Sequence, residues 1–239
     1  MIQFQVTKDF GNPLLPVSKA RSELYLSSAL AIYEMRSTKE SSGNGKALEV
    51  NGLTFDSEGL ICDGIDGHYA DTGIIEPLAN TVIMAFRADK PGATSQLYSS
   101  LAEGTSPYTG TRAAVTKDGF FVADVGIHVS EGGAYTGRAQ TGDITPGWEI
   151  VAVVTSAKGI SVTRMTTGGS NYGLFDSRTN PKNTVRIGGG YIAPHNLGIV
   201  GRIGLWAMYT GAMNTTTVDY LLEKARGIMA GKGVIIQAP

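Results

Sequence analysis

The sequence predicts an all-β protein in which two antiparallel sheets pack as a sandwich and a short helix follows at the C-terminus. Short strand-like runs recur at close, regular spacing between turn residues. Glycine makes up 32 of the 239 residues, which suits a chain with many turns. Strands do not alternate with long helices, as a parallel α/β sheet would require. A β domain of this length can bury a substantial core.

The first 27 residues are expected to form an N-terminal arm. Pro13 and Pro16 follow Gly11-Asn12 and favour an extended segment with turns. A helical turn or two fits residues 18–28. We place one sandwich domain in residues 28–239, because no internal repeat or change of composition marks another boundary.

The strands are expected where apolar or alternating runs lie between turn residues. They span residues 29–36, 60–62, 81–88, 96–101, 113–116, 120–128, 149–155, 160–165, 185–188 and 203–209. Asp118-Gly119 and Lys158-Gly159 predict two hairpin tips.

Two of these strands are apolar on both faces. Their alternating sets are Trp148, Ile150, Ala152 and Val154 against Val151 and Val153, and Ile203, Leu205, Ala207 and Tyr209 against Trp206 and Met208. A strand with one face in water is polar on that face. A further layer should therefore cover both strands, and either another part of this chain or a second subunit fits the pattern.

The C-terminal helix is expected to begin near Asn214-Thr215, because these residue types favour N-caps. Gly227 or Gly231 can end it. We expect its apolar stripe to pack against a sheet edge. The stripe consists of Val218, Leu221, Leu222, Ala225 and Met229.

Composition excludes several classes of protein. The net charge of −1 gives no electrostatic footprint for nucleic acid or an anionic membrane. No apolar run approaches the roughly 18 residues of a membrane helix. Cys62 is the single cysteine, so no intrachain disulfide can form, and a small buried hydrophobe is expected there. No signal peptide is recognisable after Met1, so synthesis in the cytoplasm is expected.

The order of these motifs resembles the laminin-G-like branch of the concanavalin A-like lectin/glucanase superfamily, over about residues 28–226. The matching segments are 30–34, the turn Ser41-Ser42-Gly43-Asn44-Gly45, the acidic and aromatic stretch 60–69, and the strands 81–86, 148–154, 186–189 and 201–204. Cys62 and Gly67 depart from the family pattern. The resemblance implies a jelly roll of two stacked antiparallel sheets, often with a sugar-binding or protein-binding edge.

Motifs for catalysis are sparse. Enzymes of that superfamily carry two or three carboxylates at alternate positions of one strand, whereas the strands here hold only isolated Asp124 and Glu149. Paired cysteines, clustered histidines, a phosphate loop and a nucleophile elbow are all missing from the sequence. We therefore expect no enzymatic activity. A glycoside hydrolase with a displaced carboxylate pair, using Glu103 or Glu131, is the enzymatic alternative.

Candidate ligand contacts lie on loops. Sugar recognition needs aromatic faces beside planar hydrogen-bonding groups, and the candidates are Tyr108, Tyr135 with Arg138, Asn171 with Tyr172, and His195 with Asn196. Calcium is the one metal hypothesis, with Asp63, Asp66 and Asp71 as its oxygen ligands. Ordinary Asx turns explain the same three residues. No other cofactor is expected.

These features favour a non-enzymatic virion protein, a structural or attachment component of a phage tail or capsid surface that binds host-surface glycans. Such a protein is made in the host cytoplasm and needs no export signal or disulfide, and its arm can join neighbours. The expected partners are further copies of the chain, other virion proteins or a cell-surface polysaccharide. A decoration protein that binds only protein, a carbohydrate-binding module and a glycoside hydrolase are the alternatives.

Overall fold

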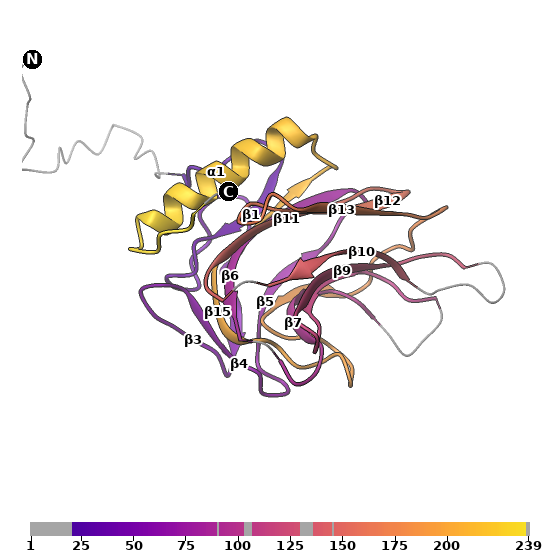
Figure 1. Ribbon diagram of the computed structural model, residues 1–239, viewed down its shortest axis with the longest axis horizontal. Helices are drawn as coiled ribbons and strands as arrows, with labels where there is room; N and C mark the ends of the chain where they lie inside the picture. The colour runs from indigo at the N-terminus through magenta and orange to yellow at the C-terminus, as the bar shows by residue number, and fades with distance from the viewer. Residues whose placement is uncertain (1–20, 90, 103–106, 130–135, 145, 238–239) are drawn as a thin grey trace, which may run out of the picture.

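The computed structural model describes residues 21–89, 91–102, 107–129, 136–144 and 146–237. Two antiparallel sheets stack face to face, and one helix lies on the outer side of the first sheet (Figure 1). This arrangement confirms the predicted fold class, a two-sheet β-sandwich with a short C-terminal helix. Among the described helices, none has the length and apolar character needed to span a bilayer.

Sheet A contains eight strands, seven of them in the order β13-β12-β11-β6-β15-β4-β3, while β1 pairs with β15. Their bounds are β1 Ala29–Tyr33, β3 Thr54–Phe55, β4 Leu60–Asp63, β6 Asn80–Ala88, β11 Glu149–Thr155, β12 Gly159–Arg164, β13 Ser170–Leu174 and β15 Val200–Thr210. Sheet B contains seven strands in the order β10-β9-β8-β7-β14-β5-β2. Their bounds are β2 Glu49–Asn51, β5 Tyr69–Ile75, β7 Ser95–Ser99, β8 Thr111–Val115, β9 Phe120–Gly126, β10 Thr136–Asp143 and β14 Thr184–Ile187.

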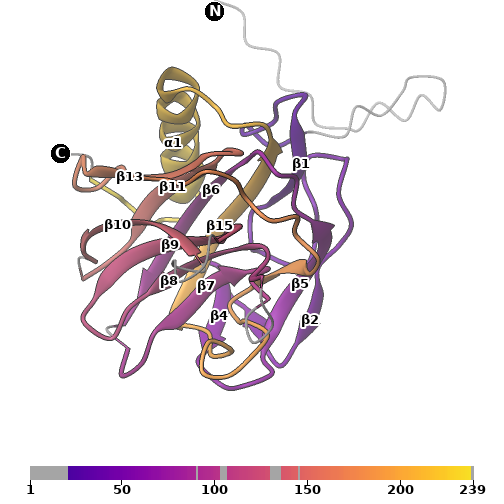
Figure 2. The ribbon, with the colours of Figure 1, turned by 90° about the vertical axis from the view of Figure 1, so that its right-hand side faces the viewer.

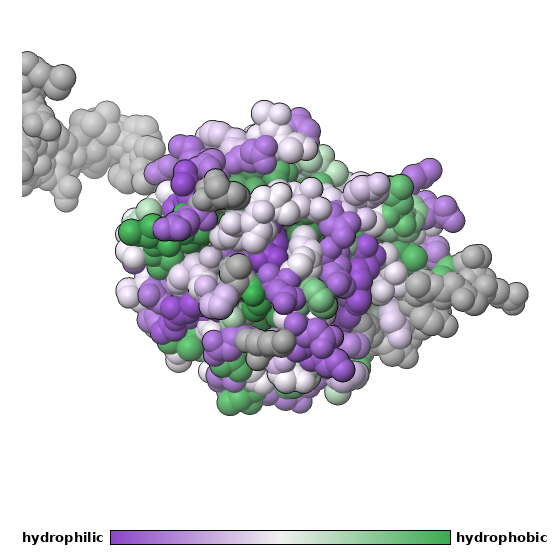
Figure 3. All heavy atoms as spheres, viewed as in Figure 1, coloured by the Kyte–Doolittle hydropathy of each residue, from purple (hydrophilic) through white to green (hydrophobic). Residues whose placement is uncertain are grey.

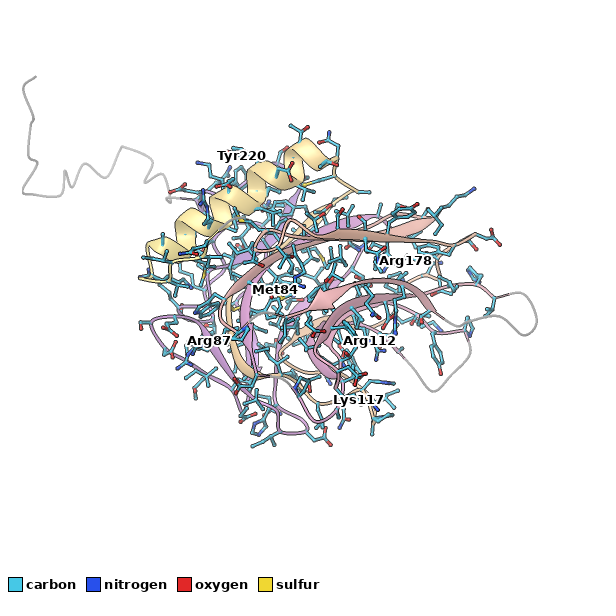
Figure 4. The ribbon with its side chains drawn as sticks, viewed as in Figure 1. Met84, Arg87, Arg112, Lys117, Arg178 and Tyr220 are labelled. Atoms are coloured by element: carbon cyan, nitrogen blue, oxygen red, sulfur yellow. The ribbon has the colours of Figure 1, made fainter. Side chains whose placement is uncertain are left out.

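The core between the sheets is built around Trp206. Its ring centroid lies 6.0 Å from that of Tyr33 and 6.2 Å from that of Tyr98, and all three side chains are fully buried. Met84 belongs to the same core, between the two layers in Figure 4. Cys62 also packs here, and burial raises the pKa of its thiol to about 12. The expectation of a small buried hydrophobe at this position is confirmed.

A second core lies on the outer face of sheet A, beneath the helix α1 (Thr215–Ala230). The predicted apolar stripe of α1 packs here on β11, β6 and β15. Leu24, from the segment before β1, is fully buried in the same core. The two-faced strands are therefore covered from within the chain. The expectation that α1 packs against a sheet edge was wrong, because the apolar face that needs cover lies on the central strands.

The ends of α1 follow the sequence signals. The Asn214 side chain accepts a hydrogen bond from the backbone N–H of Thr217 at 2.9 Å, and the helix ends at Gly231. The alternating sets predicted for β11 are confirmed, since Ile150 and Ala152 face the helix and Val151 faces sheet B.

One member of the sets predicted for β15 faces the other way. Ile203 lies in the core between the sheets, whereas Leu205, Ala207 and Tyr209 lie under the helix. The pairing of β15 with β6 shifts register between Ile203 and Leu205. A bulge of this kind inserts one residue and reverses the side-chain alternation, which a strict period of two does not anticipate. At the bulge, a Cβ on Gly204 would lie 2.7 Å from the Met229 sulfur.

The sandwich is closed along one side by its own sheet edges. β10 and β13 are end strands of sheets B and A, and they approach each other closely (Figure 2). A Cβ added to Gly173 would lie 2.0 Å from the carbonyl oxygen of Arg138, so only glycine fits there. The Asn171 amide donates a hydrogen bond to the Gln140 carbonyl at 2.5 Å and ties the two edges together.

The polar turn at residues 41–45 is organised by Glu40. Its carboxylate accepts backbone N–H bonds from Ile32 at 2.9 Å, Ser42 at 2.6 Å and Gly43 at 2.7 Å. Burial of the carboxyl acts to raise its pKa, but the hydrogen bonds outweigh burial, and the net effect is a lowered pKa. Gly43 supplies the positive φ of 84° that this turn needs.

Glu40→Gln is expected to reduce the free energy of unfolding at pH 7 by about 1 kcal/mol, because it weakens charge-assisted hydrogen bonds. The lowered pKa means that the folded state binds this proton less readily than the unfolded state. The stabilisation is therefore complete above the ordinary value of 4.5 and is lost as the pH falls through the folded pKa. Denaturation of both proteins between pH 7 and pH 3 tests this. A difference that stays constant over that range would contradict it.

Candidate functional site

A groove of about 550 Å³ lies on the outer side of sheet A, between α1 and the β12–β13 hairpin. The hairpin contributes polar, aromatic and apolar side chains, and the N-terminal half of α1 contributes the opposite wall. The strand-side residues are Ser161, Thr163, Arg164, Met165, Gly168, Ser170, Asn171 and Tyr172, and the helix-side residues are Thr215, Asp219, Leu222 and Glu223.

The alternation of side chains along a strand and the 3.6-residue repeat of a helix explain why these side chains face the groove. Val162 lies in the core between the sheets, so Ser161 and Thr163, which flank it on β12, point to the opposite face. Along α1, Thr215, Asp219 and Glu223 are spaced four residues apart and share one helix face. The hydroxyl-bearing face of β12 is therefore set opposite a carboxylate-bearing face of α1.

Tyr172 is the exposed aromatic residue of the groove, with 71% of its surface accessible. Asn171 fixes the backbone beside it, because its side chain donates to Gln140 and accepts the Tyr172 backbone N–H at 2.7 Å. Thus the structure brings the predicted pair Asn171 and Tyr172 into one groove. An aromatic face on a strand, beside hydroxyl and carboxylate groups, is suited to stacking on a sugar ring.

The positive charge in the groove is already compensated. Arg164 is 2% exposed and donates to both carboxylate oxygens of Glu149, at 2.7 and 2.5 Å. Its remaining nitrogen donates to the backbone carbonyls of Gly142 and Asp143. Arg164 therefore acts as a buried brace between β12 and the end of β10, and little of its charge reaches a ligand.

The negative charge in the groove is less compensated. The Glu223 carboxylate pairs with the guanidinium of Arg226, one turn further along α1, at 3.0 Å. Asp219 forms no ion pair or side-chain hydrogen bond with any residue that the structure describes. Within the described part of the chain, Asp219 is thus a groove carboxylate without a side-chain partner, and it lines the same groove as Tyr172.

Arg138 lies elsewhere, on the outer face of sheet B. Its Nε donates to the fully buried Asp124 carboxylate at 2.6 Å, and Arg112 donates to the same carboxylate at 2.9 Å. The hydrogen bond to Asp124 raises the pKa of Arg138. Arg112 lies beside β9 on the side of sheet B turned away from sheet A (Figure 4). These three side chains form a structural network, and Asp124 is not a free carboxylate for catalysis.

The remaining sugar-site candidates do not join the groove. His195 lies against Ser99, Arg112 and Ile192 in a crevice too narrow to admit water. Asn196 supplies a backbone carbonyl to the Gly190 N–H in the same loop. Tyr108 is partly buried, and its backbone carbonyl accepts a bond from the Thr179 hydroxyl at 2.6 Å. Tyr135, Glu103 and Glu131 lie outside the described residues.

The three aspartates of the calcium hypothesis are not brought together. Asp63 accepts bonds from the Ile65 N–H and from His68, at 3.1 and 2.9 Å. Asp71 accepts bonds from the Gly73 N–H and the Thr184 hydroxyl, both at 2.8 Å. Within the described ranges, no three His, Cys, Asp or Glu side chains are grouped to hold a metal ion. Asp63 and Asp71 instead cap local turns, as the Asx-turn alternative predicts.

The helix-side wall of the groove was missed by sequence reasoning. Thr215, Asp219 and Glu223 follow a clear four-residue spacing, but their significance depends on α1 lying beside the β12–β13 hairpin. The sequence analysis assigned only the apolar stripe of this helix. A polar stripe beside an apolar one is typical of any surface helix, so the signal alone does not reveal a site.

No family model matches the chain, and no curated protein sequence matches it. Solved structures match in fold, with 140 chains in all. Trypanosoma rangeli sialidase in complex with sialic acid has a TM-score of 0.64 at 14% identity; the match covers 86% of this chain and 34% of the sialidase. Domain 4 of the extracellular arabinanase AbnA from Geobacillus stearothermophilus, in complex with arabinotriose, has a TM-score of 0.55 at 12% identity, covering 82% of this chain and 98% of that domain.

Both matches share the fold described above, two antiparallel sheets stacked as a β-sandwich. A third match agrees: the botulinum neurotoxin serotype D binding domain has a TM-score of 0.60 at 9% identity, covering 82% of this chain and 50% of that one. At these identities the likeness establishes the fold alone. This chain spans only about a third of the sialidase, so the whole enzyme's activity does not transfer with the fold.

Proposed function

We propose that this protein is a non-catalytic carbohydrate-binding module that holds a glycan in the groove between α1 and the β12–β13 hairpin. The observation that carries the proposal is Tyr172, a strongly exposed aromatic ring in a groove of about 550 Å³ lined by hydroxyl, amide and carboxylate groups. Sugar rings stack on accessible aromatic faces that lie beside hydrogen-bonding groups.

The comparisons support this proposal at the level of fold. The arabinanase domain, which the match covers over 98% of its length, was solved with arabinotriose bound and shares the sandwich architecture. Among the described strands, the two buried carboxylates, Asp124 and Glu149, support a non-catalytic role. Asp124 is bound by two arginines and Glu149 by Arg164, so neither is available as a nucleophile or a general acid. Attachment to a virion and assembly into a homo-oligomer both stay predictions.

Tyr172→Ala is expected to weaken glycan binding by at least about tenfold, because truncating an aromatic anchor removes most of its stacking contact. A glycan array identifies the ligand, and calorimetric titration measures its affinity. Tyr220→Ala is the matched control: Tyr220 is half-exposed on the side of α1 that faces away from the sheets (Figure 4) and does not line the groove.

Equal losses for both variants, or no loss for Tyr172→Ala, would place the binding surface elsewhere. The same titrations, followed by an assay for reducing ends, test the non-catalytic part of the proposal. Release of reducing ends by the wild-type protein would favour the glycoside hydrolase alternative.

A further inference from the structure

We infer that this groove selects uncharged, hydroxyl-rich glycans and rejects glycans that carry carboxylate or sulfate groups. The inference rests on the proposed function and deepens it, because it assigns the chemical class of the ligand. It follows from the charges that face the groove, which come from Arg164, Asp219 and Glu223.

Arg164 cannot serve as an anion receptor. An acidic sugar would have to displace the bidentate Glu149 carboxylate from a guanidinium whose side chain is 2% exposed. Breaking that pair would leave a buried carboxylate without its cation, which is strongly unfavourable. The single arginine that lines the groove therefore forms part of its wall, but its charge is neutralised by Glu149.

Asp219 gives the groove its negative charge. It is exposed, it has no ion-pair partner among the described residues, and Glu223 beside it is balanced by Arg226. An ionised carboxylate accepts hydrogen bonds but donates none, so it matches the hydroxyl groups of a neutral sugar. Against a second carboxylate about 4 Å away, even full solvent screening leaves a penalty of about fivefold in affinity.

The arginines on the outer face of sheet B are engaged within the protein and do not add free positive charge there. In the view of Figure 3, hydrophilic residues are spread over the molecule and interrupted by small hydrophobic patches. The best-placed arginines on the opposite sheet are engaged: Arg138 and Arg112 by Asp124, and Arg186 between the rings of Tyr69 and Tyr191, at 3.8 and 3.9 Å.

The test uses the full chain and an array of oligosaccharides printed as neutral and acidic pairs, such as lactose beside sialyllactose and a xylo-oligosaccharide beside its glucuronate-substituted form. We expect Tyr172-dependent binding to neutral members, at least about fivefold tighter than to their acidic partners at low salt. High salt should reduce that preference. Asp219→Lys should abolish or invert it, whereas Asp118→Lys, at an exposed hairpin tip on sheet B, should leave it unchanged.

The outcomes separate the two claims. Tighter, Tyr172-dependent binding of acidic members by the wild-type protein would overturn the charge selection and leave the groove as the binding site. An Asp219→Lys variant with an unchanged preference would also overturn it. No Tyr172-dependent binding to any glycan would overturn the proposed function itself.

Discussion

Arg178→Met is expected to lower the free energy of unfolding by about 3–5 kcal/mol, the usual cost of leaving one member of a buried ion pair without its partner. Arg178 and Glu76 are both fully buried, and a guanidinium nitrogen lies 2.5 Å from the carboxylate. The same guanidinium donates to the Thr111 hydroxyl at 2.7 Å and to the Leu78 carbonyl at 2.6 Å. It thus joins β8 of sheet B to the chain that enters β6 of sheet A.

Arg178 lies between the two sheets in Figure 4, where water cannot replace the lost donors. Urea denaturation followed by circular dichroism measures the effect. Arg226→Met is the matched control, because its partner Glu223 is exposed and such surface pairs contribute about 0–1 kcal/mol. Equal, small losses for both variants would contradict the structural role of the pair. Adding Glu76→Leu to Arg178→Met should recover part of the loss, because no charge then stays buried.

Leu221→Asp is expected to destabilise the protein by about 4 kcal/mol or more, since it removes a buried side chain and places an unpaired charge in an apolar layer. Leu221 is fully buried between α1 and sheet A. Tyr220→Asp is the matched control on the adjacent, half-exposed position of the same helix, and it should cost well under 1 kcal/mol. A similar loss for both variants would mean that the helix is sensitive to any new charge.

The two tryptophans can show whether α1 detaches locally or the whole domain unfolds. Trp148 packs against the helix-side core, and Trp206 is fully buried between the sheets. In Trp148→Phe and Trp206→Phe backgrounds, each transition reports one core. We expect the two transitions of Leu221→Asp to coincide, because β15 contributes side chains to both cores. A separate early transition at Trp148 would show that the helix layer is an independent unit.

The sequence predicted the inner strands far better than the outer ones. The expected runs 81–88, 149–155 and 203–209 fall inside the observed strands β6, β11 and β15. These three strands form the centre of sheet A. The unpredicted strands include β2, β3, β10 and β13, which are the four sheet ends, together with β5. Strands at the end of a sheet bury few side chains, and most residues of β13 are exposed. Such strands therefore lack the alternation of apolar residues by which strands are recognised in a sequence.

The groove could be predicted only in part. Asn171 and Tyr172 were identifiable because an aromatic and an amide stand together in a Gly-rich and Ser-rich stretch. The other wall required knowing that α1 covers the face of sheet A and reaches β12, which depends on long-range packing. Likewise, the buried pairing of Glu149 with Arg164 follows from the β11–β12 register and from no local motif.

The meeting of β10 and β13 has a consequence for assembly. An unpaired strand edge is the usual template on which a foreign strand adds by β-augmentation. Here Gly173 abuts the Arg138 carbonyl, and Asn171 occupies the Gln140 carbonyl, so these two edges shield each other from such addition. A partner chain that extends a sheet would therefore add beside one of the other edge strands, β2, β3 or β1. Any assembly on the β10–β13 side has to be built from side-chain contacts instead.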